Sequence, residues 1–369
     1  MRLARSSLHA YRLPYTRPVQ WSDTVEEGGS FLLLRLESDD GHVGVAEMTL
    51  KPTWTGYGLR SLSAALTEVL LPRLAGADLG SESDVTQRLQ PIPGQHAPKA
   101  LLDNALWDLR AAAARQPLWR QWGGLAEVPV SYTVTRQAPP AMAREAAQVV
   151  ERLGVSVLKV KGGQGAELDA QVLRVLRGAV GPDVRFYVDA NGAYPAREAA
   201  AYARAMFDAG AVVVEDPCPL VPGRDFTRLQ AALPARVLVD FACWGERDLR
   251  LFAEAGARAF SLKPGRFGLT ETRAMQRAAG AAVTTVVGLF GESALGTWQA
   301  LALAACLGPD ALPAEVTWYL EMQEQVLHDT PRIRGGRIAL PDAPSVAERM
   351  DWERLQRLAI APATEAIHA

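Results

Sequence analysis

Ionisable side chains stand at the ends of successive short apolar runs, and their types suit the transfer of a proton. The runs end, in order, in Lys159 and Lys161, Asp189, Glu215, Asp240, Lys263 and Glu292. Three consecutive runs thus end in a carboxylate, and runs ending in lysine flank them on both sides. Only five of the 39 Lys and Arg residues are lysine. Because lysine can lose its proton when it is desolvated and arginine effectively cannot, lysines at these positions are candidates for catalysis.

The three carboxylates are typical ligands of a hard metal ion. Asp189, Glu215 and Asp240 supply only oxygen, which favours Mg²⁺, with Mn²⁺ as a substitute. A zinc site is not expected, because no histidine follows an apolar run. The histidines are His9, His42, His96, His328 and His368. A hard cation held by the three acids would stabilise the enediolate that forms when a carboxylate substrate loses the proton on its α-carbon.

The base that removes this proton must be neutral near pH 7, although an ordinary lysine has a pKa of about 10.4. Lys159 and Lys161 project from the same face of an extended strand, because side chains alternate along it. Two ammonium groups close together, beside a divalent cation, depress each other's pKa. We therefore expect Lys161 to be the base and Lys159 to tune it. Lys263, four runs further along the chain, is expected to face Lys161 across the substrate.

The apolar runs that carry these residues alternate with alanine-rich amphipathic stretches. The runs are 128–134, 155–160, 184–188, 211–214, 236–239, 259–262 and 282–287. Near-continuous apolar strands alternating with helices indicate a parallel sheet covered on both faces. The run ends are about 25 residues apart, the length of one strand-plus-helix unit, and seven or eight such units favour a closed barrel. A doubly wound open sheet is disfavoured, because no G-x-G-x-x-G follows the first run.

The pattern therefore predicts an α/β protein with a TIM-like (β/α)₇β barrel over residues 126–322. Residues 1–125 are predicted to form an α+β capping domain. The repeat ends after the barrel, and the segment 323–369 is expected to pack back on the capping domain. The elements expected in the capping domain are a β-hairpin of 31–36 and 43–47 around Asp39-Asp40-Gly41 and helices near 60–75 and 97–115.

The residues at the run ends resemble the ordered motifs of the enolase superfamily, most closely those of its mandelate racemase and muconate-lactonizing-enzyme subgroup. The matching segments are Leu158-Lys159-Val160-Lys161, Val188-Asp189-Ala190-Asn191, Val214-Glu215-Asp216-Pro217, Val239-Asp240, Leu262-Lys263-Pro264-Gly265 and Glu292-Ser293-Ala294-Leu295-Gly296. The resemblance covers nearly the whole chain and implies that Asp189, Glu215 and Asp240 ligate Mg²⁺. It further implies that Lys161 and Lys263 are opposed acid and base groups. The residues expected to support these groups or to contact the substrate are Asn191, Asp216, Glu292 and Ser293.

Three positions depart from patterns seen in this family. The residue after Asp240 is Phe241, where the family usually has glutamate, so a carboxylate expected near Lys263 is missing. An additional glycine precedes Glu292, so the pattern does not fix the direction of its side chain. The segment 315–319 lacks the Asp-x-Asp of the family's dipeptide epimerases, which disfavours a dipeptide substrate.

Aromatic residues of the N-terminal loops are expected to contact the substrate. Trp21, Trp54 and Tyr57 lie where the capping domain of this family closes over the barrel, and Trp318 follows the last strand. Four aromatic side chains at one mouth could enclose an apolar group or a quaternary ammonium group through cation–π contact. Ordinary packing is the alternative, since the chain has nine tryptophans.

Composition excludes several classes of partner. The formal net charge of −2 gives no overall attraction for nucleic acid or for an anionic membrane. Three scattered cysteines do not form a disulfide framework, and neither a signal peptide nor a membrane-spanning run is recognisable. We expect a cytoplasmic enzyme with a small carboxylate substrate, and the family resemblance implies a homo-oligomer.

The reaction expected first is racemisation or epimerisation at the α-carbon of an N-substituted amino acid, either N-acylated or betaine-like. The same pair of lysines also suits the cycloisomerisation of a muconate or a dehydration of the o-succinylbenzoate synthase type. Two more distant alternatives stay open at this point. One is an aldolase in which a lysine attacks a carbonyl group to form a Schiff base, and the other is a non-catalytic relative.

Overall fold

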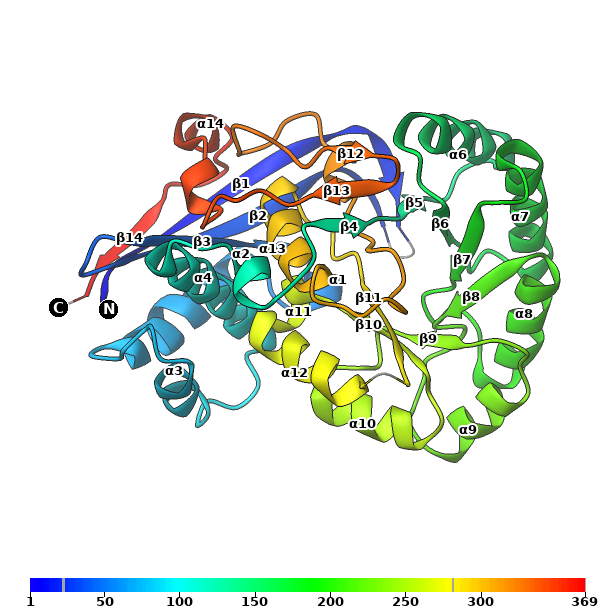
Figure 1. Ribbon diagram of the computed structural model, residues 1–369, viewed down its shortest axis with the longest axis horizontal. Helices are drawn as coiled ribbons and strands as arrows, with labels where there is room; N and C mark the ends of the chain where they lie inside the picture. Colours follow the sequence, from blue (N-terminus) through cyan, green and yellow to red (C-terminus); the bar gives the residue numbers. More distant parts are fainter. Residues whose placement is uncertain (22–23, 281, 369) are drawn as a thin grey trace.

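The β-branched runs form parallel strands, as expected for strands that are buried on both faces of a sheet. The computed structural model describes residues 1–21, 24–280 and 282–368. In it, seven parallel strands lie in the order β11-β10-β9-β8-β7-β6-β5, which follows the chain without a reversal (Figure 1). The strands are β5 (Tyr132–Val134), β6 (Val157–Lys161), β7 (Arg185–Asp189), β8 (Ala211–Glu215), β9 (Val237–Val239), β10 (Ala259–Leu262) and β11 (Thr284–Val287).

The segment 312–315 bridges the two outer strands of this curled sheet. On one side, Glu315 donates a backbone hydrogen bond of 2.8 Å to Val287 at the end of β11. On the other side, Ala314 donates one of 2.9 Å to Pro129, which precedes β5. The predicted (β/α)₇β barrel with an N-terminal capping domain is confirmed.

Helices surround the strands of the barrel, most of them amphipathic, whereas the last, α13 (Ala294–Ala304), is buried between the barrel and the capping domain (Figure 1). In the first of them, Met142, Ala146 and Val149 are buried at the spacing of three to four residues that places them on one face. The helices are α6 (Pro139–Leu153), α7 (Ala166–Val180), α8 (Ala196–Asp208), α9 (Arg224–Ala231), α10 (Glu246–Glu254), α11 (Pro264–Phe267), α12 (Leu269–Ala279) and α13 (Ala294–Ala304). A separate apolar cluster from alternate strand positions comprises Val157, Tyr187, Val213, Leu238, Ala259 and Val286.

An antiparallel sheet of order β14-β1-β2-β3 forms the core of the capping domain. Its strands are β1 (Leu3–Gln20), β2 (Val25–Ser38), β3 (Val43–Thr49) and β14 (Thr364–Ile367). The predicted hairpin is present as β2 and β3, but the long strand β1 was not predicted, because arginine, serine and proline interrupt its apolar alternation. The helices of this domain are α1 (Pro52–Thr55), α2 (Leu59–Ala64), α3 (Glu82–Leu89), α4 (His96–Ala114) and α5 (Leu118–Gln121), with helical turns over Ala65–Leu70 and Leu71–Leu74.

Strand β3 packs directly on helix α4. A Cβ atom at Gly44 would lie 2.4 Å from the backbone of Ala105 and Leu109, so only glycine allows this approach. Next to it, the buried Asp108 accepts a hydrogen bond of 2.9 Å from the Val45 amide. The same carboxylate accepts one of 2.7 Å from the Val346 amide, which ties the segment after the barrel to the capping domain.

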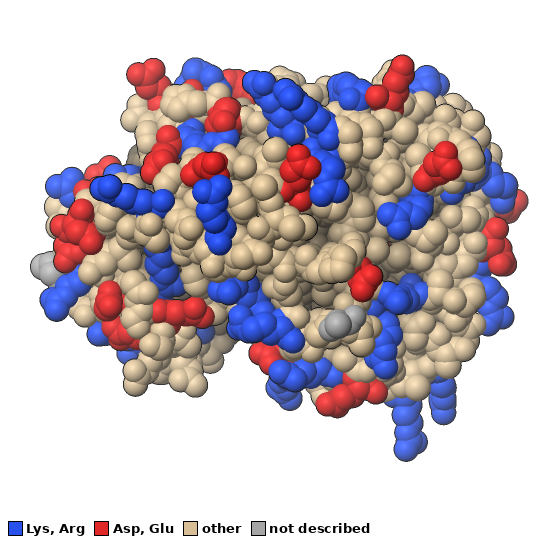
Figure 2. Space-filling model, in the orientation of Figure 1, with Lys and Arg blue, Asp and Glu red and all other residues tan. Residues whose placement is uncertain are grey.

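The apolar run 128–134 does not form one strand, contrary to the prediction. Its first part belongs to β4 (Glu127–Pro129), which pairs antiparallel with β13 (Arg337–Ala339), and only β5 enters the barrel. The remaining elements after the barrel are β12 (Ile333–Arg334), α14 (Trp352–Arg357) and helical turns over Trp318–Glu321 and Ala347–Arg349. None of the described helices is long and apolar enough to cross a membrane. Basic and acidic side chains are interspersed over the face shown in Figure 2.

A buried carboxylate of the capping domain fastens the two domains together. Glu47 of β3 is 3% exposed. Its Oε1 accepts hydrogen bonds of 2.8 and 3.1 Å from the amides of Ser293 and Gly296 at the start of α13. Its Oε2 accepts one of 2.6 Å from the Ser293 hydroxyl and another from Tyr11. A carboxylate is favourable at the N-terminus of a helix, where amides lack partners within the helix.

Replacing this carboxylate is expected to destabilise the protein. Glu47→Ala leaves the Tyr11 hydroxyl and two amides of α13 buried without an acceptor, which should lower the free energy of unfolding by about 3 kcal/mol. Chemical denaturation measures this change, with Glu27→Ala at an exposed position of β2 as the matched control. Equal stability of the two variants would contradict the role assigned to Glu47.

Candidate active site

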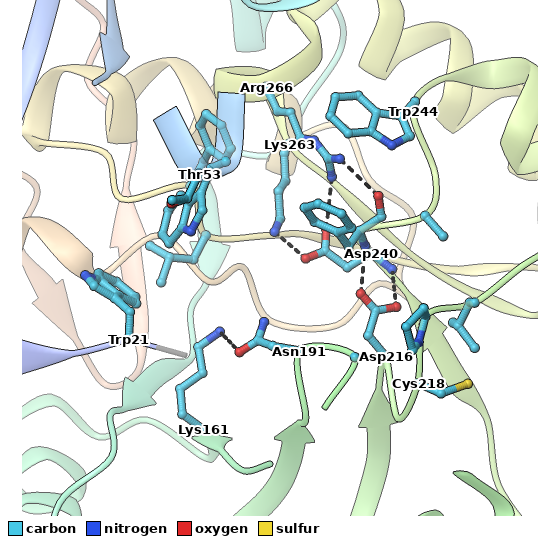
Figure 3. Close-up of a pocket in the computed structure, with 18 of the residues that line it drawn as sticks. Trp21, Thr53, Lys161, Asn191, Asp216, Cys218, Asp240, Trp244, Lys263 and Arg266 are labelled. Atoms are coloured by element: carbon cyan, nitrogen blue, oxygen red, sulfur yellow. Dashed lines mark hydrogen bonds and ion pairs between the residues drawn. The ribbon is translucent and has the colours of Figure 1, made fainter. Parts of the chain in front are cut away.

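The ends of the barrel strands surround a cavity of about 560 Å³ (Figure 3). Several of the residues singled out in the sequence line it, namely Trp21, Trp54, Lys159, Lys161, Asn191, Asp216, Asp240 and Lys263. Asp189 and Glu215 are buried against Lys159 and Lys161. The structure therefore brings the predicted acids and lysines together at the end of the barrel where parallel strands carry functional groups.

Lys159 lies at the centre of a buried cluster of carboxylates. Its Nζ is 3.2 Å from Asp189, 2.7 Å from Glu215 and 2.9 Å from Glu315, and its side chain is 1% exposed. Burial alone would lower the pKa of Lys159, but Glu215, Glu315 and Asp189 raise it well above its usual range. These carboxylates favour the charged form of Lys159, a direction opposite to the lowering expected from a neighbouring ammonium group.

Lys161 reaches the cavity from the end of β6. Its Nζ lies 2.6 Å from Asp189 Oδ2. It also lies 3.3 Å from Asn191 Oδ1 (Figure 3). The Asn191 amide donates back to Asp189 Oδ1 over 2.9 Å, with Asn191 in the left-handed region at φ 50°. Burial alone would raise the pKa of Asp189, but Lys161 and Lys159 lower it below its usual range. Asp189 is thus an ionised acceptor for both lysines of β6.

Lys263 reaches the same cavity directly after β10. Its Nζ lies 2.5 Å from Asp240 Oδ2, and the Arg266 guanidinium lies 3.9 Å from Asp240 Oδ1. Arg266 also donates to the Phe241 carbonyl over 3.0 Å and stacks 3.8 Å from the ring of Trp244. Phe241 stands where glutamate was expected, and the carboxylate that pairs with Lys263 is Asp240.

Asp216 holds the turn that carries Asp240. Its backbone is in the left-handed region at φ 39°, a strained conformation for aspartate. Its carboxylate accepts hydrogen bonds of 3.1 and 2.7 Å from the amides of Asp240 and Phe241. Burial and the neighbouring Asp240 raise the pKa of Asp216 to about 7.

The acids fit a divalent cation by their chemistry rather than by their spacing. Among residues 1–21, 24–280 and 282–368, no group of three or more His, Cys, Asp or Glu side chains is arranged so that it could hold a metal ion. Lysine ammonium groups instead contact Asp189, Glu215 and Asp240. Yet Glu215 Oε1 and Asp240 Oδ1 are buried and accept no hydrogen bond from a described residue. Burial and Asp189 also raise the pKa of Glu215, so this cluster would be stabilised by additional positive charge.

The aromatic residues separate into those that face the cavity and those that do not. Trp21 and Trp54 line it, but Lys51 already places its ammonium 4.6 and 4.1 Å from the centres of their rings. Trp318 packs behind Trp21 with ring centres 4.5 Å apart. Tyr57 does not line the cavity, and its hydroxyl donates to Gln95 over 2.9 Å.

Glu292 is buried and interacts electrostatically with Lys263, but it does not line the cavity. Its Oε2 accepts a hydrogen bond of 2.8 Å from the Phe290 amide. A Cβ atom at Gly265 would lie 3.0 Å from Oε1, so the glycine leaves room for the carboxyl group. Burial raises the pKa of Glu292 to about 7, although the backbone hydrogen bond and Lys263 oppose this shift. Ser293 caps α13 and donates to Glu47 instead of facing the cavity.

Three further residues of the site were not predicted. Glu315 contacts Lys159 from the segment that bridges β11 and β5, and its position after the short apolar stretch 311–314 was the available signal. Arg266 and Trp244 line the cavity, but neither stands out in a chain with many arginines and nine tryptophans.

The ionisation of Glu292 is expected to appear in the pH dependence of stability. Its pKa rises from 4.5 to about 7 on folding. The native state thus binds the proton more tightly, so stability falls by about 3 kcal/mol as pH rises from about 4.5 to about 7. Glu292→Gln should remove this fall, measured in EDTA as the difference between the unfolding free energies of wild type and variant. A difference that is constant with pH would contradict the shift.

Comparisons with known proteins agree with this geometry. A family model described as "Enolase C-terminal domain-like" matches residues 141–354. A second, described as "Mandelate racemase / muconate lactonizing enzyme, N-terminal domain", matches residues 7–123.

Relatives match over almost their whole length. N-succinylamino acid racemase of Thermus thermophilus is 27% identical over 98% of both chains. o-Succinylbenzoate synthase of Geobacillus kaustophilus is 27% identical over 89% of this chain and 88% of its own. The solved structure of muconate lactonizing enzyme from Mucobacterium Smegmatis with muconolactone is 25% identical, with a TM-score of 0.92 over 98% of this chain and 100% of its own. The chain therefore belongs to the mandelate racemase and muconate lactonizing enzyme group of the enolase superfamily.

Proposed function

We propose that this protein is a Mg²⁺-dependent racemase or epimerase that acts at the α-carbon of an N-acylated amino acid. The observation that carries the proposal is the placement of Lys161 and Lys263. They enter one cavity from β6 and from the end of β10, and three strands with carboxylates at their ends, β7, β8 and β9, lie between them. A substrate carboxylate drawn towards the centre of this arrangement would present the two faces of its α-carbon to different lysines.

The two lysines divide the work of inversion. Lys161, as the neutral amine, would take the α-proton from one face, and the Lys263 ammonium would deliver a proton to the other face; the roles exchange for the opposite enantiomer. Both side chains are about one-tenth exposed, at 11% and 10%, whereas Lys159 is 1% exposed. Lys159 would therefore act as a fixed charge and not as a proton carrier.

Asp189, Glu215 and Asp240 are the residues that we propose to hold Mg²⁺. Glu215 Oε1 and Asp240 Oδ1 are buried and accept no hydrogen bond from a described residue, which supports this assignment, as does a donor set made only of oxygen. When bound, Mg²⁺ supplies stabilisation of the negative charge that develops on the substrate carboxylate. The Asp216 carboxylate would keep Asp240 in place through the hydrogen bonds that it accepts from the backbone amides of Asp240 and Phe241.

The relatives support the reaction class and leave two others to be tested. The Thermus thermophilus relative is named for racemisation of an N-succinylamino acid. Others are named o-succinylbenzoate synthase and muconate cycloisomerase. The Lys51 ammonium group already lies against the Trp21 and Trp54 rings. This favours an N-acyl substrate over a quaternary ammonium compound that would bind against these rings.

The first test follows the α-hydrogen in D₂O. With Mg²⁺, wild-type protein should exchange the α-hydrogen of an N-succinyl amino acid and convert each enantiomer into the other with the skeleton unchanged, as NMR and chiral chromatography would show. EDTA should stop both, and added Mg²⁺ should restore them. A change of mass or absorbance with o-succinylbenzoate precursors or muconate alone would identify a dehydratase or cycloisomerase. Borohydride trapping with full activity in EDTA would identify a Schiff-base enzyme.

Variants of the two lysines should each lose one half of the reaction. Lys161→Ala is expected to stop exchange of one enantiomer, Lys263→Ala that of the other, and either should lower racemisation by about 10³-fold or more. Lys99→Ala, which removes a lysine that bonds to the Ile92 carbonyl away from the cavity, is the control and should retain activity. Unchanged turnover in Lys161→Ala would favour a non-catalytic role for the site.

A further inference from the structure

A cation of the chain itself fills the aromatic roof of the cavity. Lys51 Nζ lies 4.6 Å from the centre of the Trp21 ring and 4.1 Å from that of Trp54. The two rings meet edge to face, with centres 5.1 Å apart. Glu26 contacts both the lysine and one of the rings. One carboxylate oxygen lies 3.2 Å from Lys51 Nζ, and the other accepts a hydrogen bond of 2.8 Å from Trp21 Nε1. We refer to Lys51, Glu26, Trp21 and Trp54 as the roof cluster.

The roof cluster stands between the cavity and the interior of the capping domain. Trp21 and Trp54 line the cavity, whereas Lys51 is 5% exposed and does not line it. Trp21 and Thr53 lie on one side of the cavity, and Trp244 lies on the other (Figure 3). A substrate group that extends from the lysines towards the capping domain would therefore meet the rings and not the ammonium group.

We propose that Lys51 is a specificity-determining residue that makes the roof accept an apolar side chain of the substrate and disfavour a cationic one. This inference rests on the proposed racemisation of N-acyl amino acids and names the side chains that the reaction would take. Lys51 already occupies one face of each ring, and its positive charge disfavours a second cation against the same pair of rings. Glu26 balances its charge, so that the cation can stay buried between the rings.

The other charged residues of the cavity also disfavour a cationic substrate group. Lys161, Lys263 and Arg266 line it and would repel a cationic substrate group. Among the described residues of the lining, the acids are Asp216 and Asp240, and both are engaged, the first with backbone amides and the second with Lys263. An apolar group against Trp21 and Trp54 would instead gain from leaving water.

The matched probes are N-succinyl-norleucine and Nα-succinyl-lysine, which have the same four-carbon side chain and differ in the terminal ammonium group. With Mg²⁺ present, wild type should prefer the norleucine compound by about 100-fold in kcat/KM for racemisation, because the ammonium group meets a roof that already holds a cation. Lys51→Met keeps an unbranched side chain that is one atom shorter and removes its charge, and it should narrow the preference for the norleucine compound by about 10-fold. Lys51→Arg keeps the positive charge and should retain the preference of wild type.

Two further variants control for folding and for general effects of charge. Lys51→Met leaves the half-buried Glu26 without its lysine partner. The double variant Lys51→Met/Glu26→Gln removes the pair and provides a second measurement if the single variant unfolds. Lys99→Met removes a lysine outside the cavity and should leave the preference of wild type unchanged. A preference that stays the same when Lys51 loses its charge would overturn the proposal.

Calorimetric binding of the two compounds separates this proposal from the proposed reaction. If neither compound is racemised but the norleucine compound binds more tightly and Lys51→Met narrows the difference, the reaction is wrong and the roof assignment stands. If both are racemised and wild type binds them equally, the reaction stands and the roof assignment is wrong. Failure to bind the norleucine compound at all also overturns the roof assignment.

Discussion

One buried ammonium group holds the catalytic end of the barrel together. Lys159 of β6 contacts carboxylates from β7, from β8 and from the segment that bridges β11 and β5. A single cation therefore joins elements that lie on both sides of β6 in the curled sheet. Removing the Lys159 ammonium, or the carboxylates around it, would leave buried charges of one sign without their partners. This is far more costly than the loss of a surface ion pair. The proposed chemistry depends on this cluster, because it fixes the directions of the acids and leaves proton transfer to the more exposed lysines.

Selectivity and chemistry are assigned to different parts of the fold. The proposed acid and base groups stand on barrel strands or directly after them, where backbone hydrogen bonds on two sides limit their motion. The roof cluster belongs to the capping domain, which is fastened to the barrel through Glu47 at the start of α13. The segment between β11 and α13 contributes Leu289 and Phe290 to the cavity wall, so the same anchor positions part of the wall. Substitutions in the roof can therefore change the accepted side chain without moving the lysines.

Sequence patterns predicted the parts of the site that depend on periodicity. Each of Lys161, Asp189, Glu215 and Asp240 follows an apolar run, and the barrel rule places such positions at one mouth. Glu315 was missed because the segment that carries it is too short to form a recognisable apolar run. The split of the run 128–134 was missed because pairing with β13 is not visible in local composition. Lys51 could not be placed from sequence either, since its contact with two rings depends on how two loops of the capping domain approach each other.

The position of β14 separates the order of synthesis from the order of assembly. This strand forms the edge of the capping sheet against β1, although the entire barrel lies between them in the chain (Figure 1). A ribosome therefore completes every barrel strand before the outermost strand of the capping sheet is available. Until then the N-terminal half of β1, from Arg5 to Leu8, keeps one backbone edge unpaired, and unpaired edges can recruit other chains. Joining the two strands by circular permutation would make this pairing local and shorten the exposure of that edge.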